Sequence, residues 1–160
     1  MTIQILSLVI ALLAVIVGPY ITYRITKKNL EFQFRTMIKE HWVKKLEDAA
    51  HIFLNTTSEW MNKYPMIQDG SWHVKDPNQE IDRMLDLIHS SIIKLQLLLN
   101  IEKKEQSAIL DKVAIISSIV HSKVYDDNSI RTLRKTHDEM IDSLQIIFHK
   151  ERTKIADIFR

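Results

Sequence analysis

The stretch DPNQEIDRMLDLIHSSIIKLQLLLN, residues 76–100, decides the fold class of this chain. It begins with a helix start, because Asp76 suits the N-cap, Pro77 the first helical position and Gln79 the third. Apolar residues then recur at steps of three and four, at Ile81, Leu85, Ile88, Ile92, Leu95 and Leu99. This spacing places them on one face of a helix. The stretch therefore predicts an amphipathic helix that ends near Asn100.

The same periodicity continues on both sides of this helix. Residues 24–64 predict one long helix, and residues 102–125 and 129–158 predict two more. Their apolar stripes are Phe34, Ile38, Trp42, Leu46, Ala49, Phe53 and Trp60; Leu110, Val113, Ile116 and Val120; and Leu133, Ile141, Leu144, Phe148 and Ile155. Residues 65–79 are rich in turn signals and predict a loop. No run has the two-residue period of a strand, so we expect an all-α fold built on an antiparallel four-helix bundle.

An apolar stretch precedes the bundle. Residues 3–23 read IQILSLVIALLAVIVGPYITY and contain no charge. About 20 apolar residues are needed to cross the roughly 30 Å hydrocarbon core of a bilayer, so this stretch predicts a transmembrane helix. A cleaved signal peptide is the alternative, but no basic residue precedes the stretch and no small-residue cleavage site follows it. We expect a transmembrane helix over residues 1–24 and a helical bundle over residues 25–160.

The charges beside this stretch predict its orientation. Arg24, Lys27 and Lys28 follow it, whereas Met1 and Thr2 precede it without a charged side chain. Positively charged flanks stay on the cytoplasmic side of the membrane. We therefore expect a single-pass protein of the bacterial inner membrane, with its N-terminus outside and its C-terminal domain in the cytoplasm.

Small or weakly polar residues recur along the predicted transmembrane helix, at Gln4, Ser7, Ala11, Ala14 and Gly18. They fall on a single stripe, and small residues at this spacing let transmembrane backbones approach closely. Chance is the alternative, because such residues are common in spans. We interpret the stripe as a self-association surface, so the expected partners are the lipid bilayer and further copies of the chain in a ring. Because a helix is about 10 Å wide, a ring needs about five or more subunits before water can pass.

The composition excludes several kinds of chemistry. The chain has no cysteine, so disulfides and zinc–thiolate sites are excluded. Its 22 basic and 20 acidic residues give a net charge of +2, too small to indicate direct binding of nucleic acid. It contains no phosphate-binding loop, dinucleotide-binding glycine motif, HExxH or Gly-x-Ser-x-Gly sequence. We expect no cofactor and no metal.

One catalytic pattern is present, an arginine followed six residues later by a histidine. It occurs as Arg35/His41, Arg83/His89 and Arg131/His137. In helical ribonucleases of the HEPN type, the arginine can stabilise charge on the scissile phosphate and the histidine can move the proton of the attacking 2′-hydroxyl. Arg131 and His137 are the candidate pair because they begin the last long helix. His137 also lies on an apolar stripe with Leu133 and Ile141, so a core or interface histidine is the alternative interpretation.

The layout of the whole chain resembles a known family. A predicted span, a helical bundle and a late Arg131/His137 pair are similar to the small pore-forming membrane accessory proteins of type VI-B CRISPR systems, which work beside an RNA-guided ribonuclease. Three stretches are also similar to a broader set of small bacterial membrane proteins, some of which are antiphage defence effectors. These stretches are HWVKKLEDAAHIFL at 41–54, KLQLLLNIEKKEQSAIL at 94–110 and FHKERTKI at 148–155.

The resemblance implies an HEPN-like bundle and a ring-shaped assembly that opens the inner membrane when defence is triggered. It also implies an RNA-guided CRISPR ribonuclease as a partner. Thr132 follows Arg131 where active HEPN ribonucleases usually carry Asn, His or Asp, so the expected effector is not an enzyme. Two other functions stay open at this point. One is a membrane-tethered HEPN-type ribonuclease that uses Arg131 and His137, and the other is an anchored helical scaffold that recruits a cytosolic partner.

Overall fold

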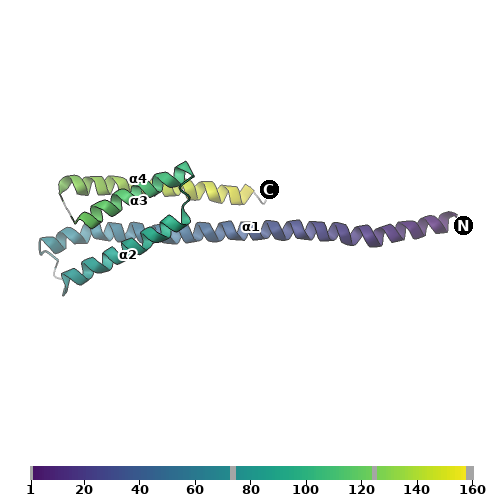
Figure 1. Ribbon diagram of the computed structural model, residues 1–160, viewed down its shortest axis with the longest axis horizontal. Helices are drawn as coiled ribbons and strands as arrows, with labels where there is room; N and C mark the ends of the chain where they lie inside the picture. The colour runs from purple at the N-terminus through teal and green to yellow at the C-terminus, as the bar shows by residue number, and fades with distance from the viewer. Residues whose placement is uncertain (1, 73–74, 124–125, 158–160) are drawn as a thin grey trace. The chain divides into compact units, whose positions relative to one another are not determined.

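A computed structural model describes the backbone of residues 2–72, 75–123 and 126–157, and the side chains from residue 15 onward within these ranges. The chain forms four helices, α1 (Thr2–Gln68), α2 (Pro77–Leu98), α3 (Lys104–Ser122) and α4 (Asp127–Ala156) (Figure 1). The described residues contain no strand. The predicted all-α class is therefore confirmed, and the two helices expected over the first 64 residues belong to one helical element, α1.

The chain divides into two compact units within α1. The first unit is Met1–Glu40 and the second is His41–Arg160. The second unit contains the end of α1 together with α2, α3 and α4, and consecutive helices reverse direction (Figure 1). The connections between them are short, and short connections favour antiparallel neighbours. This unit is the four-helix bundle that the periodicity predicts.

The core of the second unit is made largely by the predicted apolar stripes, with Met84, Ile109 and Met140 added to them. Its largest fully buried side chains are Leu46, Phe53 and Trp60 from α1, Met84, Ile88 and Leu95 from α2, Ile109, Val113 and Ile116 from α3, and Leu133, Met140 and Leu144 from α4. Each helix thus contributes three of these residues, and removing them from water is the main favourable term in folding. Most charged positions between them face the solvent, as the 3.6-residue period requires, but Thr57, Ser91 and His137 are polar residues buried within the bundle.

Two aspartates begin helices in the bundle. The Asp76 side chain accepts a hydrogen bond from the Gln79 backbone amide at 3.1 Å, which confirms the predicted start of α2. Asp126 accepts one from the Ser129 amide at 2.7 Å at the start of α4. Such caps satisfy amide groups that have no partner within the helix.

The end of α1 differs from the prediction. Residues 65–79 were expected to be a loop, but α1 continues through Pro65 to Gln68. Proline lacks an amide hydrogen and removes one helical hydrogen bond, but its carbonyl still accepts one. Here the Pro65 carbonyl accepts a hydrogen bond from the Asp69 amide at 2.9 Å. The helix is terminated instead by Gly70, whose φ of 72° is accessible to glycine without steric cost.

Two residues of the predicted core stripe lie outside the core. Phe34 and Ile38 are 59% and 52% exposed, whereas Leu46 and Phe53 on the same stripe are fully buried. The physical reason is that the bundle begins at His41, so Phe34 and Ile38 belong to the first unit. An apolar period can show which face of a helix is apolar, but it does not show where a partner helix begins to cover that face.

Candidate functional site

His137 lies on the inner side of α4. Its side chain is buried, and Nε2 lies 3.2 Å from the Leu54 backbone carbonyl of α1. A carbonyl oxygen accepts hydrogen bonds, so Nε2 carries the hydrogen and donates it. The other ring nitrogen, Nδ1, lies 3.5 Å from a carboxylate oxygen of Asp138. The imidazole therefore links two helices of the bundle.

Arg131 lies on the outer surface of α4 and is exposed. A separation of six residues turns an α-helix through about 240°, so Arg131 and His137 leave the axis in directions about 120° apart. One side chain is in the solvent and the other is buried. The structure does not bring them together around a common space where a phosphate could bind.

The structure also shows where the other two arginine–histidine pairs lie. His89 is exposed on α2, and its ring lies edge-on to His121 of α3, with 6.3 Å between the ring centroids. Arg83 instead belongs to an ionic cluster with Glu59 and Glu80. Arg35 and His41 are both exposed on α1. Among the described residues, no group of three or more His, Asp or Glu side chains is arranged to hold a metal ion.

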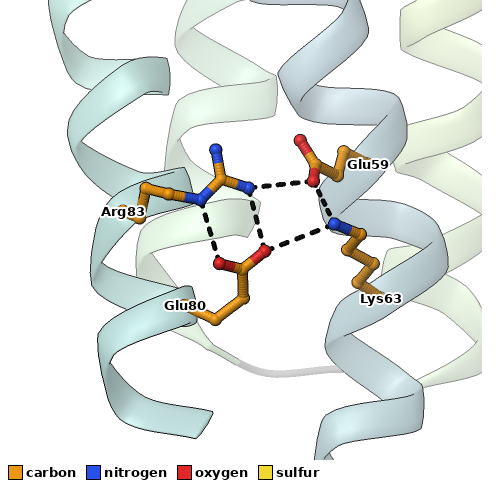
Figure 2. Close-up of polar contacts among 4 residues, drawn as sticks. All are labelled: Glu59, Lys63, Glu80 and Arg83. Carbon is orange, nitrogen blue, oxygen red and sulfur yellow. Dashed lines mark hydrogen bonds and ion pairs between the residues drawn. The ribbon is translucent and has the colours of Figure 1, made fainter. Parts of the chain in front are cut away.

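The ionic cluster joins α1 to α2 (Figure 2). Arg83 donates to both carboxylate oxygens of Glu80 at 2.9 Å and to Glu59 at 2.9 Å. Lys63 bonds to Glu59 and lies 3.3 Å from Glu80. The Lys63 ammonium also lies 4.6 Å from the ring centroid of Trp72, a cation–π distance. The cations Lys63 and Arg83 are thus each paired with both anions, Glu59 and Glu80.

The cluster fixes the charge of its members. The hydrogen bonds from Arg83 lower the pKa of Glu80 to about 2. The hydrogen bond to Glu59 raises the pKa of Lys63, and the hydrogen bond to Glu80 raises the pKa of Arg83. Glu80, Lys63 and Arg83 are therefore held in their charged forms at neutral pH, with their partners in place. Groups matched in this way connect helices and offer no free base to a substrate.

The predicted self-association stripe lies in the first unit. The side chains of Gln4, Ser7, Ala11 and Ala14 are outside the described residues. Gly18 is exposed, and a Cβ atom built there would meet no other atom within 4 Å. This part of the helix surface is therefore accessible to another helix.

The first unit exposes large apolar side chains around the whole helix. They are Val15, Ile16, Val17, Tyr20, Ile21, Tyr23 and Ile25. An element that is apolar on every side is normally surrounded by protein or lipid. Over the part of the chain that the structure describes, no helix combines the length and the hydropathy that membrane crossing requires.

Comparison with protein-family models, with curated proteins and with solved structures finds no match for this chain.

Two features of the structure were not found from the sequence. The ionic cluster had a local signal in the helical spacings Glu59/Lys63 and Glu80/Arg83, but their pairing across two helices had none. The His89–His121 contact joins residues from different helices and likewise left no sequence signal. Such contacts depend on how helices pack and not on local periodicity.

Proposed function

We propose that this protein is anchored in the bacterial inner membrane, assembles into a ring and raises the permeability of that membrane during antiviral, CRISPR-associated defence. One observation carries the proposal. Residues 3–23 contain no charge, and the large apolar side chains described from Val15 to Ile25 are exposed. Apolar surface in water costs roughly 25 cal/mol per Å². Acyl chains or neighbouring spans would cover this surface and remove the cost.

The residues after this stretch support the proposed orientation. Arg24, Lys27 and Lys28 are all exposed, so their charges are available to lipid headgroups. Positive residues beside a span remain on the cytoplasmic side. In this proposal the helical bundle is cytoplasmic and is the part that would contact an RNA-guided CRISPR ribonuclease.

Self-assembly through the small-residue stripe would supply the pore. The open surface at Gly18 supports close approach of a neighbouring helix. Contacts between unlike faces of identical subunits close into a ring when the rotation allows it. A constriction lined by uncharged side chains can stay closed by excluding water and conduct when it widens.

The placement of Arg131 and His137 favours this effector over a ribonuclease. A general base must reach the proton that it removes, at roughly 2.6–3.2 Å. The Nε2 atom of His137 is bonded to the Leu54 carbonyl, and Arg131 lies on another face of α4. These positions support a structural role for His137.

The first experiment tests location and permeability together. A reporter that is active only in the cytoplasm, fused after Arg160, should be active, and the full-length protein should release dye from vesicles of bacterial lipid. Gly18→Leu places a bulky side chain on the stripe, whereas Val17→Leu changes a neighbouring face. We expect Gly18→Leu to insert in the membrane, to form smaller species in mild detergent and to release dye at least about tenfold more slowly, because close helix approach is blocked. Val17→Leu should behave as wild type.

Distinct results would refute distinct parts of the proposal. A C-terminal fusion active only in the periplasm would refute the orientation. Wild-type protein that is monomeric in several mild detergents and in nanodiscs would refute the ring. Cleavage of single-stranded RNA that disappears in His137→Ala would show that the protein is a ribonuclease.

A further inference from the structure

A second apolar stripe begins in the last residues of the uncharged stretch and continues beyond it. It consists of large side chains in the first unit: Tyr20 is 59% exposed, Tyr23 64%, Leu30 60%, Phe34 59% and Met37 59%. With Lys27 between them, these positions recur at steps of three and four, so they share one face of α1. The bundle begins only at His41, which leaves this face uncovered within its own unit.

Basic residues lie beside the apolar stripe. Residues 24–40 contain five basic residues and two acidic ones, namely Arg24, Lys27, Lys28, Arg35 and Lys39, with Glu31 and Glu40. Arg24, Lys28, Arg35 and Lys39 fall on one stripe by their spacing. The Arg24 guanidinium lies 5.8 Å from the ring centroid of Tyr20, so the aromatic and basic side chains are adjacent. The segment is therefore apolar on one face and positive on the next.

The helix can bend just before this segment. Pro19 has no amide hydrogen, so the carbonyl of Val15 loses its helical partner. The Thr22 hydroxyl donates to the Gly18 carbonyl at 2.9 Å, and such side-chain bonds to the preceding turn often bend helices. A Gly–Pro step with this bond permits the helix axis to change direction between the span and the segment.

We infer that the membrane crossing ends near Pro19, after about 17 residues, and that residues 20–38 lie in the interface of an anionic bilayer, with the stripe of Tyr20 to Met37 toward the acyl chains and the basic stripe on lipid phosphates. The inference rests on the membrane location in the proposed function. Interfacial helices have this pattern of one apolar face with basic residues at its border. Tyrosine is enriched at the level of the headgroups, and the Lys27 side chain can extend its ammonium to the phosphates while its stem stays among apolar groups.

Either lipid or a second copy of the chain could cover the apolar stripe, and the charge of the segment favours lipid. Parallel copies in one membrane would bring their surplus of positive charge together, which is unfavourable. An anionic surface attracts each of these basic residues. Anionic lipid therefore complements both stripes, whereas a second copy complements only the apolar one.

The absence of cysteine makes the test direct, because one introduced cysteine takes one label. In the full-length protein, Phe34→Cys places an environment-sensitive fluorophore on the apolar stripe. Asn29→Cys, which is also exposed, places it about 140° around the helix. Both proteins are reconstituted in phosphatidylcholine vesicles with and without phosphatidylglycerol, and a quencher attached to the acyl chains is added. We expect quenching at position 34 to be several-fold stronger than at position 29 in the anionic vesicles.

Charge reversal provides the second variant. Lys28→Glu with Arg35→Glu should reduce quenching at position 34 at least about twofold while the protein still floats with the vesicles. Equal, weak quenching at both positions in protein that floats with vesicles would overturn the inference and leave the anchor intact. Position 34 shielded from an aqueous quencher but not reached by the lipid quencher would show a second copy on the stripe, and would also overturn it. Protein that does not float would overturn the proposed location together with the inference.

Discussion

Replacing Glu80 by glutamine tests how much the ionic cluster contributes to the bundle. Arg83 binds both oxygens of this carboxylate, and its hydrogen bonds lower the Glu80 pKa from 4.5 to about 2. At 1.36 kcal/mol for each tenfold change, this corresponds to at most about 3 kcal/mol of stability at neutral pH. The side chains of Glu80 and Arg83 are 21% and 45% exposed, so solvent screening reduces the expected contribution to about 1–2 kcal/mol.

The dependence on pH follows from the direction of the pKa change. The folded pKa lies below the unfolded one, so the stabilisation is fully present above about pH 4.5 and is lost as the pH falls toward 2. Urea unfolding of the full chain in mild detergent, followed by circular dichroism, measures the free energy of unfolding. We expect Glu80→Gln to lower it by about 1–2 kcal/mol at neutral pH, and less than half of this difference should remain near pH 3.

Glu139→Gln is the matched control. Glu139 lies 3.8 Å from Lys135 in a pair whose side chains are 51% and 76% exposed. Exposed pairs of this kind contribute about 0.5 kcal/mol or less. Equal effects of the two substitutions, or an effect of Glu80→Gln that stays constant between neutral pH and pH 3, would refute the expected contribution of the ionic cluster.

Two further predictions concern hydrogen-bonding side chains of the bundle. His137→Ala should lower the free energy of unfolding by about 1–3 kcal/mol, because a hydrogen bond and packing are lost. Arg131 is exposed, so Arg131→Ala should stay within about 0.5 kcal/mol of wild type. Equal effects of the two substitutions in urea unfolding would contradict this. Trp42→Phe removes a donor bonded to a backbone carbonyl at 2.8 Å and should cost about 1–2 kcal/mol. Trp60→Phe removes a buried donor that has no hydrogen-bond partner in the described structure, and with it the free-energy cost of burying that donor. Losing this cost should offset the loss of ring volume, so the free energy of unfolding should stay within about 1 kcal/mol of wild type. A larger loss in Trp60→Phe than in Trp42→Phe would refute the comparison.

The helical elements of the bundle and most of their inward positions could be predicted from the sequence. The cap at Asp76 and the period from Ile81 to Leu99 predicted α2, and the helix begins at Pro77 with Ile81 and Leu99 buried. These features could be read because capping and the 3.6-residue period depend only on neighbouring residues. The charge-free composition of residues 3–23 is likewise a property of the sequence alone, and the proposed anchor depends on it.

Which polar residues meet, and which apolar faces are covered, depends on how the helices pack. Arg131 and His137 have the spacing of a catalytic pair, but packing leaves one exposed and bonds the other to the backbone of α1. Phe34 continues the period of the core stripe, yet it is exposed because the bundle begins seven residues later, at His41. Periodicity fixes the direction in which a side chain leaves its own helix. The contacts that it makes depend on the position of a second helix, and that position is set by packing between residues far apart in the chain.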